Sequence, residues 1–88
     1  MRISFLYRFN GEHSTPVSGF IRELKQRCPM ANTKEVDLNT REGASIASLY
    51  DAMNYPAIMA LREDGQLAQI WQGTPLPLVD EIASYAIQ

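Results

Sequence analysis

Four segments of the chain have the composition or the alternation of β-strands: residues 3–9, 34–40, 57–61 and 67–72. The first (ISFLYRF) is a run of aromatic and aliphatic residues, which predicts a buried strand. The second (KEVDLNT) alternates apolar with polar residues and predicts a short strand. The last two flank Glu63-Asp64-Gly65, and Asp-Gly favours the positive backbone dihedral angles of a tight turn. They are therefore predicted to form a hairpin.

Three other segments repeat apolar residues at three- and four-residue steps, which is the spacing of one face of a helix. The stripes are Val17, Phe20, Ile21, Leu24 and Cys28; then Ile46, Leu49, Tyr50 and Met53; and finally Leu78, Val79, Ile82, Tyr85 and Ala86. Each stripe is predicted to pack against the sheet.

Residues with polar side chains precede the first two helices. Ser14 or Thr15 is expected to cap the first turn of the first helix. Asn39 and Glu42 have the spacing of a capping box before the second helix. Gly43, which is a poor helix former, follows directly and weakens this second assignment.

The predicted order of elements is β-α-β-α-β-β-α. Because a helix joins the first two strands, these should be parallel with a right-handed crossover, whereas the last two should be antiparallel. An α/β fold with a four-stranded mixed central sheet and helices on both faces satisfies this order. Residues 1–88 are expected to form a single domain.

Composition narrows the classes of partner and site. The chain is 45% hydrophobic and 20% charged with a net charge of -2, which is typical of a soluble globule and unfavourable for nucleic acid binding. No apolar run approaches the roughly 18 residues of a membrane helix, so no membrane partner is expected, and the first residues indicate a strand and not a signal peptide. The single cysteine, Cys28, excludes an internal disulfide and any multi-cysteine metal site. We expect no metal, no cofactor and a cytoplasmic location.

Pro56 stands directly in front of the predicted strand 57–61. Proline is tolerated at the first residue of a strand, and an X-Pro bond adopts the cis form at a cost of only about 0.5–1 kcal/mol. A cis Tyr55-Pro56 bond would turn the chain sharply into the hairpin and leave the backbone of Tyr55 available to a ligand.

Two stretches together resemble the thioredoxin-like superfamily: VDLNTREGASIASLYDAMNYPA, which ends just after Pro56, and REDGQLAQIWQG, which ends at Gly73. The likeness covers nearly the whole chain. It implies a thioredoxin-like fold with a cis-proline beside the family's active site.

The resemblance also implies where the family's chemistry would lie, which is the start of the first helix. There, two cysteines bracket two residues, and the helix N-terminus lowers the thiol pKa. The equivalent window here is Ser14-Thr15-Pro16-Val17, which keeps the proline but replaces both cysteines. The resemblance therefore implies that disulfide exchange by the family mechanism is absent, and no catalytic residue is assigned.

What would remain is a binding groove beside the proline. In related folds, the backbone just before this proline pairs with an extended peptide or with glutathione. We therefore expect a non-catalytic module that binds a peptide or a protein through Ser14, Thr15, Tyr55 and Pro56, with Asn10 and His13 on the rim.

Two alternatives stay open. The chain could be a glutathione-dependent or thiol-redox enzyme that uses Ser14 or Cys28, with Arg8 and Arg41 holding glutathione carboxylates, although Cys28 continues an apolar stripe and is expected to be structural. It could also self-associate through the predicted edge strand 67–72, which carries no lysine or proline to protect it. Finally, Met30, Met53 and Met59 are expected to fill gaps in the core.

Overall fold

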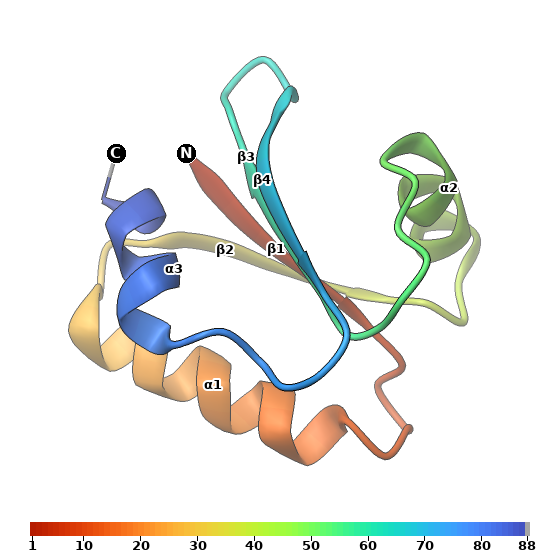
Figure 1. The fold of residues 1–88 in the computed structure, drawn as a ribbon, viewed down its shortest axis with the longest axis horizontal. Helices are drawn as coiled ribbons and strands as arrows, with labels where there is room; N and C mark the ends of the chain where they lie inside the picture. Colours follow the sequence, from red (N-terminus) through yellow and green to blue (C-terminus); the bar gives the residue numbers. More distant parts are fainter. Residues whose placement is uncertain (88) are drawn as a thin grey trace.

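The order of elements in the computed structural model, which describes residues 1–87, matches the predicted order (Figure 1). The elements are β1 (Arg2–Tyr7), α1 (Ser14–Arg27), β2 (Asn32–Asp37), α2 (Arg41–Leu49), β3 (Ala57–Leu61), β4 (Leu67–Gln72) and α3 (Val79–Ala86). Among these residues, no helix combines the length and the apolar character needed to cross a membrane.

The four strands form one mixed sheet in the order β2-β1-β3-β4. β1 pairs in parallel with β2 and antiparallel with β3, and β3 pairs antiparallel with β4. The predicted α/β architecture with a four-stranded mixed sheet is therefore confirmed.

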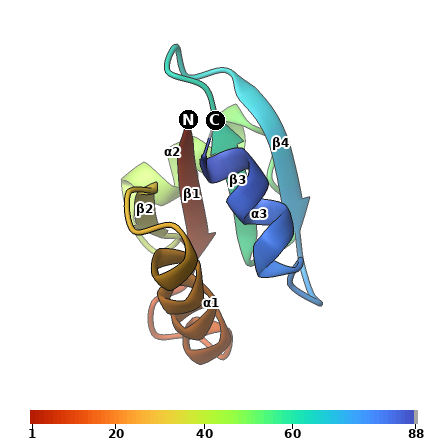
Figure 2. The same ribbon diagram turned by 90° about the vertical axis from the view of Figure 1, so that its left-hand side faces the viewer.

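Helices cover both faces of the sheet, as predicted. Figures 1 and 2 show α1 and α3 together on one face and α2 on the other. One core cluster joins β1 and β3 to α1 and α3 through residues such as Phe5, Phe20 and Ile82. The second cluster lies under α2 and includes Leu6, Val36 and Met59. Because successive side chains of a strand point to opposite faces, β1 and β3 supply both clusters and are almost entirely buried.

The two strands of the first β-α-β unit differ in their bounds from the prediction. β1 ends at Tyr7 and not at residue 9, because a turn closed by the Gly11 N–H and the Arg8 carbonyl begins there (3.0 Å). β2 spans residues 32–37 and not 34–40, because the Asp37 carbonyl accepts a hydrogen bond from the Thr40 N–H and starts the turn into α2 (3.1 Å).

Both predicted helix caps are wrong. α1 begins at Ser14, so the N-cap is His13, which makes no side-chain capping bond; neither Ser14 nor Thr15 caps the helix. α2 is capped by Thr40 and not by Asn39: the Thr40 Oγ1 accepts from the Gly43 N–H at 3.0 Å.

The charge of Glu42, the other residue of the predicted capping box, is used elsewhere. Its carboxylate lies 2.7 Å from Lys34 Nζ on β2. The start of α2 is thus fixed by the Thr40 hydroxyl and by an ion pair to the neighbouring strand.

Several apolar residues assigned to buried faces are exposed. α2 ends at Leu49, and the positive φ of Asp51 (56°) turns the chain away, so Leu49 and Met53 face outward. Leu78 precedes α3 and is also exposed. Met59 fills the core as predicted, whereas Met30 and Met53 are 95% and 79% exposed and do not.

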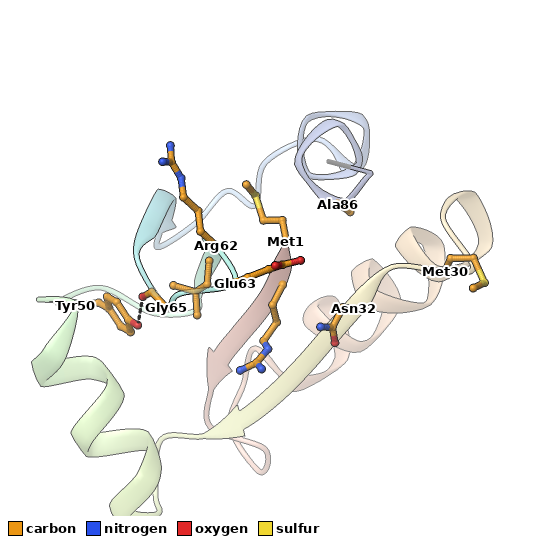
Figure 3. A pocket seen from close by; sticks show the side chains of 10 residues that line it. Met1, Met30, Asn32, Tyr50, Arg62, Glu63, Gly65 and Ala86 are labelled. Atoms are coloured by element: carbon orange, nitrogen blue, oxygen red, sulfur yellow. Dashed lines mark hydrogen bonds between the residues drawn. The ribbon is translucent and has the colours of Figure 1, made fainter.

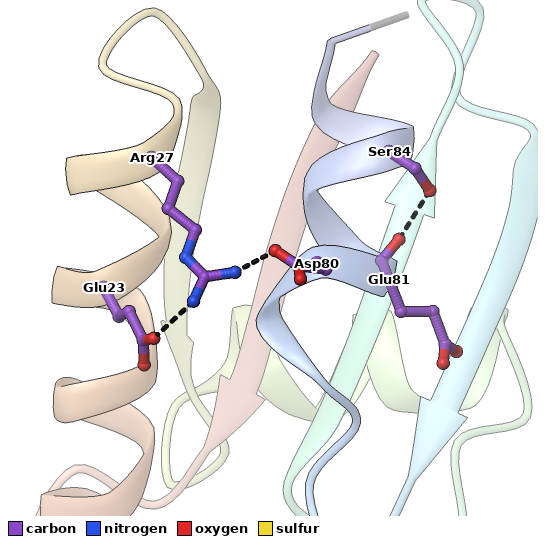
Figure 4. A network of polar contacts seen from close by, with 5 residues as sticks. All are labelled: Glu23, Arg27, Asp80, Glu81 and Ser84. Atoms are coloured by element: carbon purple, nitrogen blue, oxygen red, sulfur yellow. Dashed lines mark hydrogen bonds and ion pairs between the residues drawn. The ribbon is translucent and has the colours of Figure 1, made fainter.

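Polar contacts connect α1 to α3 at the surface (Figure 4). The Arg27 guanidinium on α1 contacts the Asp80 carboxylate on α3 and donates to the Glu23 carboxylate at 3.0 Å. On α3, Glu81 also accepts a hydrogen bond from the Trp71 indole of β4. These exposed pairs orient α3 but contribute little stability, since surface ion pairs are worth about 0–1 kcal/mol.

Gly43 permits a very close approach between α2 and the end of β2. A Cβ atom added there would lie 2.1 Å from the Asp37 carbonyl oxygen and 2.9 Å from the Leu38 Cα, both of which are backbone atoms. The first turn of α2 can approach the end of β2 only because this residue has no side chain.

We expect Gly43→Ala to lower the free energy of unfolding by about 1–3 kcal/mol, since α2 must move off β2. The matched control is Gly19→Ala in α1, where an added Cβ meets nothing within 4 Å. That change should stabilise the chain by up to about 1 kcal/mol, because alanine is the better helix former. Urea unfolding of both variants measures the difference, and equal effects would contradict the packing of α2.

Candidate functional site

Two loops meet where β1 ends and β3 begins, and they enclose a hollow of about 310 Å³ that we call the loop groove. One loop leads from β1 to α1, and the other leads from α2 to β3. The residues that line the groove are Tyr7, Arg8, Gly11, Glu12, His13, Met53, Asn54 and Tyr55. This is the end of the sheet at which the sequence predicted a site.

The first wall of the loop groove is a series of tight turns. The Gly11 N–H donates to the Arg8 carbonyl at 3.0 Å, and the Ser14 N–H donates to the Gly11 carbonyl at 3.2 Å. Arg8, Glu12 and His13 all line this wall, and Glu12 Oε1 lies 3.8 Å from His13 Nε2. The wall therefore offers charged groups of both signs.

The second wall is held in place by β4. The Gln72 Oε1 accepts hydrogen bonds from the backbone N–H groups of Met53 (2.7 Å) and Asn54 (3.1 Å). Tyr55 makes one hydrogen bond within residues 1–87, in which its hydroxyl group donates to the Ala52 carbonyl at 2.8 Å. Its own backbone N–H and C=O are therefore not engaged by the described part of the chain.

Pro56 lies beneath this wall and is buried. The Tyr55-Pro56 peptide bond is cis, and the Pro56 carbonyl accepts from the Gly73 N–H at 3.0 Å. Pro56 is thus part of the start of the β3–β4 ladder, and it supports the groove without lining it.

Tyr7 forms the inner boundary of the groove and was not identified from the sequence as a site residue. It is only 4% exposed, and its hydroxyl donates to the Glu35 carboxylate on β2 at 2.7 Å. Burial, with the hydrogen bond to Glu35 and its negative charge as further causes, raises the pKa of Tyr7 to about 12. Its hydroxyl is therefore a neutral donor at physiological pH.

A second hollow of about 400 Å³, the helix hollow, lies on the other side of Tyr7, along the first turns of α1. It is lined by Tyr7, Phe9, Ser14, Thr15, Ser18, Gly19 and Arg22. Ser14 and Thr15 thus face a neighbouring space and not the loop groove.

The structure therefore divides the predicted site residues. It brings His13 and Tyr55 together in the loop groove, and it places Ser14 and Thr15 in the helix hollow. Asn10 is exposed and lines neither space. Arg8, which was considered only as a cation for glutathione carboxylates, also lines the loop groove. Glu12, Met53 and Asn54 were not predicted as site residues, since the turns that bring them together are not encoded in apolar spacing.

The thiol of Cys28 lies at the opposite end of α1 from both spaces. Cys28 is the C-cap of this helix, and its backbone N–H donates to the Leu24 carbonyl at 2.8 Å. Since α1 has 14 residues, it spans about 21 Å at 1.5 Å per residue. Within residues 1–87, no three histidine, cysteine or carboxylate side chains gather as metal ligands.

A third hollow of about 430 Å³ lies at the opposite end of the sheet, around the hairpin turn (Figure 3). It is lined by residues that include Arg2, Asn32, Tyr50, Arg62 and Gly65, and the Tyr50 hydroxyl donates to the Gly65 carbonyl at 2.7 Å. Figure 3 shows the Arg62 side chain directed away from the other labelled groups. This hollow also has charged groups of both signs, since Glu63 lines it together with Arg2 and Arg62, but it lies far from Tyr55 and from the start of α1.

The raised pKa of Tyr7 predicts a pH dependence of stability. The ordinary value is 10.0 and the folded value about 12, so the neutral phenol favours the folded state. This contribution is complete below pH 10 and is lost as the pH rises toward 12. We expect the free energy of unfolding to fall more steeply between these values in the wild type than in Tyr7→Phe. Parallel profiles in the two proteins would contradict the buried Tyr7–Glu35 bond.

Comparisons with known proteins agree with this architecture. The sequence matches no protein-family model, and no curated protein matches it significantly. The structure is similar to that of thioredoxin O2 from Arabidopsis thaliana in its oxidized state, with a TM-score of 0.70, over 94% of this chain and 69% of that one. The two sequences are 16% identical, so the likeness concerns the fold. The chain has a thioredoxin-like fold, as the sequence predicted.

Proposed function

We propose that this chain is a thioredoxin-fold binding module without the redox dithiol, which takes an extended segment of a peptide or protein into the loop groove. The observation that carries the proposal is the groove itself. Two loops converge on Tyr55, and the groove contains aromatic, ionic and thioether side chains but no cysteine among its lining residues. Binding needs these groups, whereas disulfide exchange needs a thiolate.

The backbone of Tyr55 is the central contact in this proposal. An extended peptide adds to an exposed backbone edge by main-chain hydrogen bonds, and neighbouring side-chain pockets supply specificity. The unengaged N–H and C=O of Tyr55 offer such an edge. The side chains of Arg8 and Glu12 would then select the ligand's polar groups.

Met53 supplies the apolar part of the surface. Its side chain is 79% exposed on the second wall of the groove. A flexible, polarisable thioether adapts to ligands of different shape, which suits a peptide-binding surface. The volume of about 310 Å³ is at the lower limit for ligand pockets, so it suits a short part of a peptide.

The alternative of a glutathione-dependent or thiol-redox enzyme gains no support from the geometry. Ser14, the residue that would activate glutathione, lines the helix hollow and not the loop groove beside Tyr55. Cys28 is separated from both by the length of α1.

We expect short extended peptides that lack cysteine to shift the amide signals of residues 8–13 and 53–55 in nuclear magnetic resonance titrations. Met53→Asp should raise the dissociation constant about tenfold, because it places a charge where the apolar contact forms. Met30→Asp is the matched control: Met30 is 95% exposed but lies beyond the far end of α1, so binding should not change.

Two results would contradict the proposal. Shift changes confined to residues 62–65 would place the ligand at the other end of the sheet. Equal weakening by Met53→Asp and Met30→Asp would indicate a nonspecific effect of charge. Cys28→Ser should bind like the wild type, and loss of binding in that variant would favour a thiol mechanism.

A further inference from the structure

β4 is an edge strand whose outer side is uncovered. It is the last strand of the sheet, and Figure 2 shows no helix of the described chain beside its outer edge. Its sequence, LAQIWQ, contains no charged residue and no proline. The other edge strand, β2, carries Lys34, Glu35 and Asp37. Charged side chains protect an edge from pairing, so only β2 is protected in this way.

The hydrogen-bond pattern shows which backbone groups of β4 point outward. The Gly73 N–H donates to Pro56, and Trp71 and Gln69 stand opposite Ile58 and Ala60 in the same antiparallel register. Along one strand of such a pair, every second residue directs its backbone N–H and C=O to the partner strand, and the residues between direct theirs away from it. Gln69, Trp71 and Gly73 direct theirs to β3, so Ile70 and Gln72 direct theirs outward.

A hydrogen bond of the Ile70 N–H confirms that this group points outward from the sheet. It donates to the Gln69 side-chain Oε1 at 2.9 Å, an oxygen supplied by the neighbouring exposed residue of the same strand. A carbonyl from an added strand would provide the same hydrogen bond without bending a side chain back. The Gln69 side chain thus accepts a hydrogen bond that a neighbouring strand could accept in its place.

We propose that two copies of this chain pair through β4 in the antiparallel direction, about a two-fold axis at Ile70, to form a continuous eight-stranded sheet. The Ile70 residues of the two copies would exchange their backbone N–H and C=O groups. Gln69 of each copy would lie opposite Trp71 of the other, on the face that bears α1 and α3. This inference does not depend on ligand binding in the loop groove.

A second copy is the occupant that the strand itself favours. A two-fold axis at Ile70 places the outward-pointing backbone groups of one copy opposite those of the other. No like charges lie opposite each other, because β4 has no charged residue. Ile70 and Trp71 are only partly buried in one copy and would lose further contact with water. A charged peptide strand would find no compensating charge on β4.

We expect sedimentation velocity to show a monomer at about 10 µM and an increasing share of dimer toward about 1 mM, because a single strand pair buries little surface. Gln69→Lys should raise the dissociation constant at least tenfold. In the dimer it brings two lysine residues of like charge to diagonal positions, whose Cα atoms lie about 7–8 Å apart. Gln69 is exposed, so the circular dichroism of the variant should match the wild type. The control is Gln66→Lys, which adds the same charge at an exposed turn position outside β4 and should leave dimerisation unchanged.

Amide hydrogen exchange locates the interface. The Ile70 and Gln72 amides should gain protection as the concentration rises, whereas the Gln69 and Trp71 amides, which already face β3, should not. A chain that stays monomeric up to about 1 mM, a dimer indifferent to Gln69→Lys, or protection that appears only outside β4 would each overturn the proposal.

Discussion

The position of β1 between β2 and β3 determines the rest of the structure. β1 runs parallel to one neighbour and antiparallel to the other, so its C-terminal end lies beside the start of β3. The chain must then leave β1 for α1 at the same place where it arrives from α2. Burial of Ile3, Phe5 and Leu6, each at most 1% exposed, fixes β1 in this central position. The two loops of the groove are brought together by this arrangement and not by direct bonds between them.

The same arrangement explains why a binding function is proposed for a chain without the paired cysteines. The loops, the buried proline and the turn before α1 follow from strand pairing and backbone hydrogen bonds, which do not require sulfur. Gln72 on β4 fixes Met53 and Asn54, and Tyr7 contacts both the groove and, through Glu35, the edge strand β2. Together with the loop that leads into β3, these contacts connect the groove to all four strands.

The fold could be predicted from the sequence because its elements have strong local signals. The hairpin strands were located to the residue, since Asp64-Gly65 and the short apolar runs define them and Gly65 has the expected positive φ of 87°. The helix caps were not predicted correctly, because a cap depends on which side-chain oxygen meets a backbone N–H in space. The Thr40 hydroxyl does so, while the side chains of Ser14 and Asn39 do not. Gly43 was interpreted as a weak helix former, whereas the structure shows that it allows α2 to pack against the backbone of Asp37, six residues earlier.

The candidate site was predicted only in part, for the same physical reason. Tyr55 and Pro56 could be located because a proline before a strand constrains the backbone. Ser14 and His13 are adjacent in sequence, yet they line different hollows on either side of Tyr7. Met53 looked like a core residue because it continues the apolar spacing, but α2 ends before it. Such outcomes depend on where a helix stops and which way a loop turns, and apolar spacing carries no information on either.

Paramagnetic relaxation enhancement can measure whether the two loops lie together as one groove. A nitroxide attached to Glu12→Cys in a Cys28→Ser background would lie on the first wall of the groove. If both loops form one groove, the amide signals of residues 53–55 should broaden strongly, and those of residues 63–65, at the other end of the sheet, should broaden little. Broadening of residues 63–65 in preference to residues 53–55 would contradict this single groove.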